Sequence, residues 1–327
     1  MIFVSILLGL VLCGVVYQRA GAAYDRRRYP GPGETIQANG VQLHMYSMGQ
    51  GTPAVLFESG ISASSVNWTN LQRELSRETE AVAYDRAGLA WSGACPGPRS
   101  PEQIIAELQS VTAKIPKPFV FVGHSFGCLI GRIYASRFPD DLCGLVLIDP
   151  ALTSEWSKPS TQRRQMLARG VRLSRRGAWL CHIGFVRFCL TLLSHGARAL
   201  PKLLARASSG NASGVLDRLV GEVRKMPSEL WPSIRSHWCR PESFESMAAH
   251  LASLPAMSCA AEGVNDLGLI PVVVISGAHL TSTQRAEHAA VAATSSRGIH
   301  LNASRGGHWV QLDEPELVLA AIRGCLR

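Results

Sequence analysis

Ser125 stands between two glycines in the segment FVFVGHSFG, residues 119–127. A GxSxG pattern alone is weak evidence, because short motifs arise by chance. Here four apolar residues that predict a strand precede it, and the segment 126–138 that follows predicts a helix, which is the setting of a nucleophile elbow. Glycine at positions 123 and 127 leaves room for the tight turn. We therefore expect Ser125 to be a nucleophile at the carboxyl edge of a parallel sheet; a glycine-rich packing turn is the alternative that this setting disfavours.

A serine hydroxyl is a poor nucleophile until a base removes its proton. His308 lies in RGGHWVQLDEPELV, a Gly-Gly loop between the last expected strand and the last expected helix, from which an imidazole reaches the same sheet edge. We expect it to be the base, with a surface loop histidine as the alternative. His124, inside the elbow, is expected to point back into the sheet. The other candidates lie in an early strand or in the middle of the chain: His44, His182, His195, His237 and His250.

The elements that must position these residues alternate along the chain. Short apolar runs predict strands at residues 41–47, 54–58, 81–85, 119–122, 144–149, 271–276 and 298–302. Helical patterns fall between or after them at residues 66–78, 102–115, 126–138, 282–293 and 314–327. Alternation of this kind predicts an α/β fold, with a mostly parallel sheet covered by helices on both faces. Between Pro150 and residue 265 no strand is indicated, so we expect a helical insertion, or lid.

The expected domain organisation has five parts. These are an N-terminal anchor or signal segment (1–18), a linker (19–35), the first part of the α/β core (36–150), the helical lid (151–265) and the second part of the core (266–327).

The first 17 residues carry no charge, and Arg19 and Arg26–Arg28 follow them. This length is at the short edge of a membrane-spanning helix. Ala20-Gly21-Ala22 resembles a signal cleavage site, but no basic residue precedes the apolar run. We expect an uncleaved single-pass membrane anchor, with secretion after cleavage as the alternative; positive charge behind the segment favours a cytoplasmic location for that side. A buried core helix is disfavoured because no polar face is evident.

Charge is concentrated in the expected lid. Residues 151–250 hold 16 Lys and Arg against 6 Asp and Glu, so this segment accounts for the net charge of +9. Basic and apolar residues alternate in 177–193 and 197–207, a pattern that suits a lipid surface. A lid with a solvated arginine face explains it equally well, whereas no motif for nucleic acid accompanies the charge. The nine cysteines show no paired spacing, so neither a metal cluster nor a disulfide scaffold is indicated, and we expect no cofactor.

The chain resembles the α/β-hydrolase superfamily, in particular its lid-bearing lipase, esterase and proline-iminopeptidase-like members. The resemblance covers roughly residues 36–150 and 266–327. It is carried, in the order typical of that superfamily, by ESGISASSVNW (58–68), YDRAGLAWS (84–92), FVFVGHSFG, GLVLIDP (144–150) and GGHWVQLDEPELV (306–318). Together these stretches are specific to the fold and leave the substrate open.

The resemblance also implies an acid that orients His308. Superfamily members usually carry it after the strand before the histidine strand, but here GAHLTSTQ has no carboxylate. Some members use an acid at the end of the strand after the nucleophile helix, and Asp149 occupies that place. We expect Asp149 to be the acid, with a turn-capping role before Pro150 as the alternative. Glu287, inside an expected helix, is the reserve candidate.

An oxyanion hole is implied in the same way. Its backbone donors would be the N–H groups of Phe126, after the nucleophile, and Ile61, in the loop after residues 54–58. Many superfamily members have His-Gly in that loop, where this chain has Ser59-Gly60. Asp85 and Arg86 are expected to stabilise a loop.

Three functions follow. The first is hydrolysis of an apolar carboxylic ester through an acyl-enzyme on Ser125. The second is a proline-iminopeptidase-like aminopeptidase, which needs an acidic pocket for the substrate amine that the basic lid argues against. The third is a non-catalytic receptor or scaffold on the same fold. Serine at position 125 disfavours dehalogenase and epoxide hydrolase chemistry, which usually uses an aspartate there.

Overall fold

A computed structural model describes residues 2–95, 97–194 and 221–327. Its strands form one twisted sheet in the order β1-β2-β4-β3-β5-β6-β7-β8. The strands are β1 (Glu34–Ala38), β2 (Val41–Met48), β3 (Val55–Glu58), β4 (Ala81–Tyr84), β5 (Phe119–His124), β6 (Leu142–Ile148), β7 (Val272–Ser276) and β8 (Gly298–Asn302). Strand β2 pairs antiparallel with β1 and β4, and all other neighbours are parallel. The expected mostly parallel sheet is therefore confirmed.

The sequence reading overlooked strand β1. It forms a hairpin with β2 through Asn39-Gly40, both of which have positive φ. Asn-Gly is the favoured pair for a two-residue hairpin turn, because both central residues must take left-handed backbone angles. The signal for this edge hairpin was therefore present in the sequence.

Helices cover both faces of the sheet. The core helices are α2 (Thr69–Leu75), α3 (Pro101–Thr112), α4 (Phe126–Arg137), α12 (Ser282–Ala292), α13 (Val310–Asp313) and α14 (Pro315–Leu326), with 3-10 turns at Ser65–Trp68 and Pro139–Asp141. Apolar side chains of α3, α4 and α12 form one buried cluster with the sheet, and those of α2 and α14 form a second on the other face. The sheet is thus buried on both sides, as a parallel sheet requires.

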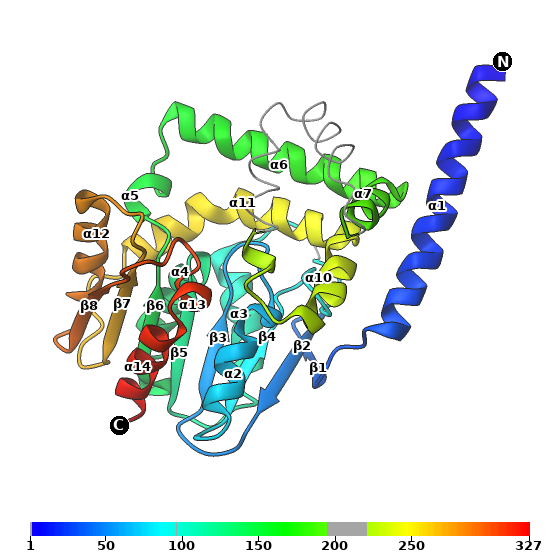
Figure 1. The fold of residues 1–327 in the computed structure, drawn as a ribbon. Helices are drawn as coiled ribbons and strands as arrows, with labels where there is room; N and C mark the ends of the chain where they lie inside the picture. The colour runs from blue at the N-terminus through cyan, green and yellow to red at the C-terminus, as the bar shows by residue number, and fades with distance from the viewer. Residues whose placement is uncertain (1, 96, 195–220) are drawn as a thin grey trace.

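The described residues between β6 and β7 contain only helices. They are α5 (Thr153–Trp156), α6 (Thr161–His182), α7 (Phe185–Ser194), the 3-10 turn Ser228–Leu230, α10 (Trp231–Trp238) and α11 (Pro241–Glu262). Figure 1 shows α11 lying across the top of the sheet and α6 lying above α11. We call the described residues 151–194 and 221–265 the cap. The predicted basic stretch 197–207 and His195 lie outside the described residues.

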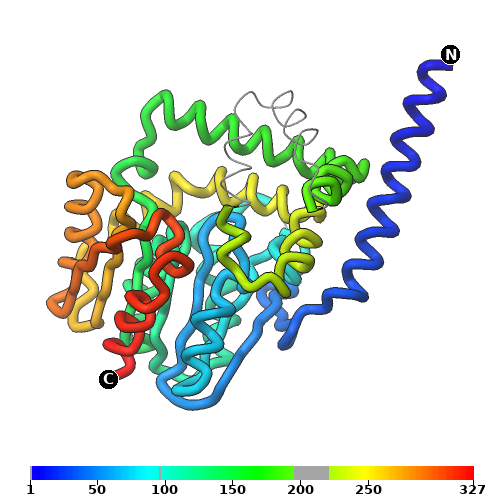
Figure 2. The backbone as a smooth tube through the Cα atoms, viewed as in Figure 1, coloured from blue at the N-terminus to red at the C-terminus, as the bar shows by residue number. Residues whose placement is uncertain are grey.

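The first helix, α1 (Ile2–Arg28), extends away from the body and continues past the expected end of the anchor at residue 18 (Figure 2). Three arginines fill its last turn, where positive charge complements the helix dipole. It is long and apolar enough to cross a membrane, with a mean hydropathy of 2.0 and only 6% of that stretch buried. Its residues 19–28, expected to be a linker, are helical and lie beside the cap.

Candidate active site

The elbow is a strained turn between β5 and α4. Ser125 has φ 53° and ψ −111°, a conformation that few non-glycine residues adopt. Its N–H donates to the carbonyl of Ile148 at 2.9 Å, which ties the turn to β6. A Cβ at Gly123 would lie 2.7 Å from the Gly127 carbonyl oxygen, and one at Gly127 would lie 2.5 Å from the Glu58 carbonyl oxygen. Both glycines are therefore required by sterics, as the sequence indicated.

Asp149 and His308 come together although 159 residues separate them. The Nδ1 atom of His308 lies 2.6 Å from Oδ2 of Asp149, and Oδ1 accepts the N–H of Gly277 at 2.9 Å. Asp149 is buried, whereas the His308 side chain is about half exposed. Burial raises the pKa of Asp149, but the hydrogen bond from His308 and its electrostatic interaction with the carboxylate lower it by more, so the net pKa lies below its ordinary value. Asp149 is therefore ionised at neutral pH and can hold the imidazole.

Two acidic residues shape the loop that carries His308. The carboxylate of Glu314 accepts the N–H groups of Ser304, Arg305 and Gly306 at 3.1, 2.5 and 2.6 Å. That of Asp313 accepts the N–H of Gly307 at 2.9 Å. Four successive backbone donors are thus satisfied by the helix that follows, which restricts the glycine loop to one shape. The motif GGHWVQLDEPELV contains this signal, but the sequence reading assigned these two acids no role.

His124 does not point back into the sheet as expected. Its ring packs against those of His308 and Trp309, with centroids 4.7 and 5.2 Å apart. Burial is the main cause that lowers the pKa of His124 to about 3, and the nearby His308 adds to this shift. The ring of His124 is therefore neutral. Its Nε2 lies 2.8 Å from the carbonyl oxygen of His308 and can donate to it. His124, in the elbow, therefore positions the loop that carries His308.

The loop after β3 lies directly beside the elbow. A Cβ built on Gly60 would lie 3.4 Å from the Cβ of Ser125, so the loop passes close to the nucleophile at Gly60, the residue before Ile61. The N–H of Phe126 begins α4 on the other side. Arg86 donates to the carbonyls of Ser59 and Gly60, each at 2.6 Å, and fixes this loop from below. The roles of Ile61 and Phe126 as oxyanion donors stay predictions.

Neighbouring charged residues have structural contacts. Arg86 forms a buried ion pair with Glu58 and contacts the Phe126 ring, while Asp85 bonds His44 and the N–H of Ser65 at 2.7 Å. Asp85 and Arg86 therefore make the contacts expected of residues that stabilise a loop.

The reserve acid Glu287 lies elsewhere. Its carboxylate accepts hydrogen bonds from Thr153 and Ser154, so it joins α12 to the start of the cap.

A second histidine faces Asp149. The Nε2 atom of His279 lies 3.8 Å from Oδ2 of Asp149, and the ligand atoms of His279, Asp149 and His308 all lie within 4.8 Å of one another. Nitrogen and carboxylate ligands of this kind suit zinc. A metal ion bound to Nδ1 of His308 would replace the proton that this nitrogen donates to Asp149, so it would compete with the histidine–aspartate hydrogen bond.

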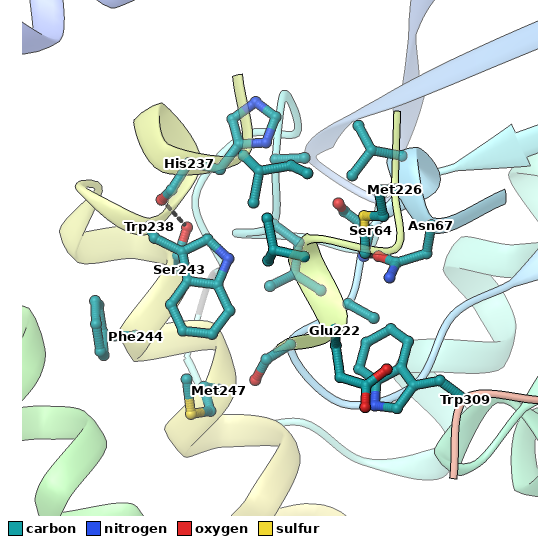
Figure 3. A pocket seen from close by; sticks show the side chains of 17 residues that line it. Ser64, Asn67, Glu222, Met226, His237, Trp238, Ser243, Phe244, Met247 and Trp309 are labelled. Atoms are coloured by element: carbon teal, nitrogen blue, oxygen red, sulfur yellow. Dashed lines mark hydrogen bonds between the residues drawn. The ribbon is translucent and has the colours of Figure 1, made fainter. Parts of the chain in front are cut away.

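A cavity of about 50 Å³ lies between the cap and the core, and its wall contains none of Ser125, Asp149 and His308. Its wall includes Ser62, which follows Ile61, and Trp309, which follows His308. Figure 3 shows Trp309 and Glu222 on one side of the cavity and Trp238 and Met247 on another. The lining is mainly apolar, as in small-molecule sites, but the volume is well below the roughly 300–1,000 Å³ of most such sites. The cap therefore supplies a large part of this cavity's wall.

A model of the alpha/beta hydrolase family matches residues 55–321. The chain belongs to this family, and the expected resemblance is confirmed. An uncharacterized protein YqjL of Bacillus subtilis is 33% identical over 122 residues, which cover 36% of this chain and 48% of that protein. A 2-hydroxy-6-oxo-2,4-heptadienoate hydrolase of Pseudomonas putida is 30% identical over 121 residues, covering 36% and 44%. The chain thus matches about half the length of these curated relatives or less.

Solved structures share the fold over nearly the whole chain. A thermophilic esterase from Thermogutta terrifontis has a TM-score of 0.60 at 21% identity and covers 90% of this chain and 97% of its own. An epoxide hydrolase from Bacillus megaterium has a TM-score of 0.64 at 16% identity, covering 90% and 99%. Proteins with such different chemistry share one fold, so the site must decide the reaction.

Proposed function

We propose that the protein is a serine hydrolase of carboxylic esters that works through a Ser125-His308-Asp149 triad. The observation that carries the proposal is the 2.6 Å contact between His308 Nδ1 and buried Asp149, with the His308 ring packed against His124, the residue before strained Ser125. Because Nδ1 is held by the carboxylate, Nε2 is the nitrogen left to take the serine proton. The match to the alpha/beta hydrolase family supports a hydrolase but leaves the ester open.

The proposed reaction has two halves. His308 takes the proton of Ser125 as Oγ attacks the ester carbonyl carbon, and the N–H groups of Phe126 and Ile61 stabilise the oxyanion. The tetrahedral intermediate collapses, the C–O bond to the alcohol breaks, and His308 returns the proton to the leaving oxygen. Water then attacks the acyl-enzyme with His308 again as base, which releases the acid and restores Ser125. Ionised Asp149 stabilises the imidazolium in both halves.

The test is labelling of the full chain in mild detergent with a fluorophosphonate probe. We expect labelling of the wild type, complete loss in Ser125→Ala and strong loss in His308→Ala and Asp149→Asn. Glu287→Gln is the matched control, because this carboxylate lies near the cap's start and should leave labelling unchanged. A folded wild type that takes up no probe would favour a non-catalytic receptor or scaffold. A chelator should not reduce labelling, since no step uses a metal.

A second candidate is an aminopeptidase of the proline-iminopeptidase type. One observation favours it, because Glu222 of the cap brings a carboxylate to the cavity. However, Lys225 lies 2.9 Å from that carboxylate and 2.5 Å from Asp313, so it neutralises the charge of Glu222 in part. A panel of aryl esters and aminoacyl arylamides separates the two candidates. Faster amide cleavage that is lost in Glu222→Gln would favour the aminopeptidase.

We also propose that α1 is an uncleaved membrane anchor. Cleavage after residues 20–22 would remove Gln18, whose side chain donates to the Cys239 carbonyl at 2.8 Å and accepts from Arg187 at 3.0 Å. Retention of α1 therefore keeps buried polar groups of the cap satisfied. Intact mass of the protein from membranes tests this proposal.

A further inference from the structure

One face of α1 is built to pack against the cap. Gly14, Gln18, Gly21 and Asp25 recur every three or four residues and therefore lie on one side of the helix. A Cβ at Gly14 would lie 2.2 Å from the Ile183 carbonyl oxygen at the end of α6. This polar and glycine stripe is the face that the sequence reading did not recognise. The second half of α1 therefore packs against the cap, in addition to continuing the apolar anchor helix.

Arg187 of α7 fastens this face. Its guanidinium lies 2.6 Å from the carboxylate of Asp25 and donates to Gln18 at 3.0 Å, and all three side chains are buried. A Cβ at Gly21 would meet the same guanidinium at 2.7 Å, so glycine is needed for its approach. A buried ion pair with extra hydrogen bonds holds two helices in one relative orientation. Any membrane that surrounds the start of α1 is therefore held at a fixed position relative to the cap.

The length of α1 sets that position. Residues 2–13, which precede the contact at Gly14, rise roughly 18 Å at about 1.5 Å per residue. The hydrocarbon core of a bilayer is about 30 Å thick. The apolar run must therefore continue past Gly14 to the first charge, Arg19, and this part of α1 lies beside α7. Since Gly14 contacts Ile183, an anchor of this length brings the corner between α6 and α7 into contact with the membrane.

The outer face of α6 has the composition of a lipid-facing surface. Met166, Arg169, Arg172, Arg176 and Trp179 follow one another every three or four residues, and all are exposed, Trp179 by 62%. The helix contains no acidic residue. Trp prefers the headgroup region, and Arg binds phosphate while its apolar stem stays in contact with the lipid. The inner face of the same helix packs on α11, where Gly177 meets Phe244. We call residues 166–179 on the exposed side the arginine face.

We propose that the arginine face rests on a membrane surface rich in anionic phospholipid, so that the hydrolase is held with its cap against the bilayer. The proposal rests on α1 being the anchor of the proposed function. Positive charge close to such a surface is attracted to its negative potential, and the fixed contact through Arg187 keeps the face within reach. The cap that walls the cavity would then be in contact with lipid, which places the proposed ester site next to lipid-dissolved substrates.

The experiment uses the full chain in nanodiscs and measures tryptophan emission. One set contains brominated phosphatidylglycerol and the other brominated phosphatidylcholine, since bromine quenches tryptophan only at close range. We expect quenching in the anionic discs that Trp179→Phe reduces by the largest single share. Trp231→Phe is the matched control, because Trp231 belongs to α10 and not to the arginine face, and it should retain most of the quenching.

Charge-reversal variants test whether the contact depends on anionic lipid headgroups. The variant Arg172→Glu, Arg175→Glu, Arg176→Glu should lose the share of quenching that depends on Trp179. The control variant Lys114→Glu, Arg297→Glu, Arg327→Glu makes the same change in net charge and should keep it. Its three residues are exposed and lie at the opposite end of the sheet.

Two results would overturn the inference. Equal quenching in Trp179→Phe and wild type would show that the cap stands away from the bilayer, and equal quenching in both lipids would remove the role of anionic headgroups. Fluorophosphonate labelling of the same discs reports the proposed triad separately. Normal labelling with no Trp179-dependent quenching would refute the surface alone, whereas release of the protein from the discs would refute both anchor and surface.

Discussion

Two buried arginine–carboxylate pairs hold different parts of this molecule. The core pair, Arg86 and Glu58, lies beneath the loop beside Ser125, and the anchor pair, Arg187 and Asp25, lies between α7 and α1. The side chains of the core pair are 2% and 1% exposed, and those of the anchor pair are 6% and 8% exposed. The chemistry is the same, but the surroundings differ.

The difference lies in how completely each arginine is satisfied. Arg86 also donates to the carbonyls of Ser59 and Gly60 and to His250, so it organises backbone that no apolar residue could hold. In the anchor pair, among the described residues, Nη2 of Arg187 has no hydrogen-bond partner. The core pair therefore specifies a loop, whereas the anchor pair specifies the relation of two helices. Variants can separate these two roles.

Replacing Arg86 by Met should have the largest effect. It leaves Glu58 buried without its cation and releases two carbonyls, so we expect a loss of about 3–5 kcal/mol in unfolding free energy. Burial already raises the pKa of Glu58 in spite of Arg86 and Tyr84. Without Arg86 the folded pKa rises further above the unfolded value, so the carboxyl takes up a proton. The loss should therefore be smaller at pH 5 than at pH 8, as measured by denaturant unfolding.

The double variant Glu58→Leu, Arg86→Met sharpens this prediction. It removes the unpaired charge but not the two unsatisfied carbonyls, so it should recover stability only in part and fluorophosphonate labelling not at all. Full recovery of labelling would show that Arg86 only balances charge.

Replacing Arg187 by Met should have a smaller effect, about 1–3 kcal/mol, because α1 can move away from the cap and hydrate Asp25. We expect faster amide hydrogen exchange in α7 and in residues 14–28, with exchange in β5 and β6 unchanged. Here the double variant Asp25→Leu, Arg187→Met should restore slow exchange, since apolar residues of similar volume can replace a buried pair. Failure of this rescue, with both single variants folded, would contradict the contrast between the two pairs.

This contrast also explains what the sequence could predict. Ser125 and His308 can be predicted from their places after a strand and in the loop before the last helix, since such positions share one edge of a parallel sheet. Asp149 is predicted only through the resemblance to the α/β-hydrolase superfamily. The residues around each of them in the chain make these positions recognisable from the sequence. The anchor pair had no such signal, because Asp25 and Arg187 are 162 residues apart and belong to helices whose contact no local pattern predicts. The stripe of Gly14, Gln18, Gly21 and Asp25 lies in the sequence, but it begins late in the apolar run and was not recognised as a polar face, and no local pattern indicates its partner.

Glu314→Gln tests a carboxylate that is held by backbone N–H groups of a nearby loop and not by an arginine. Backbone N–H groups of Arg305, Gly306 and Ser304 lower the pKa of Glu314 to about 2, from an ordinary value of 4.5. A lowered folded pKa means that its stabilisation is complete above pH 4.5 and is lost as the pH falls toward 2. We expect the wild type to lose more stability than Glu314→Gln between pH 5 and pH 3, in thermal unfolding scans. The carboxylate is exposed, so solvent keeps the difference small. Parallel pH curves for the two proteins would contradict it.

Tyr17→Phe should have the smallest effect. It tests whether an exposed contact between α1 and α7 contributes to their packing as the buried anchor pair does. The Tyr17 hydroxyl lies 3.3 Å from Thr191 Oγ1 of α7, in an exposed position on the same two helices. Because this bond is long and lies at the exposed edge of the helix pair, its loss should change stability by less than about 0.5 kcal/mol and leave hydrogen exchange of α7 unchanged. Gln18, one residue further along α1 but buried, gives the matched comparison through Gln18→Leu. If Tyr17→Phe loosened α7 as much as Arg187→Met, exposed contacts would fix α1 as firmly as buried ones, and the special role of the anchor pair would be lost.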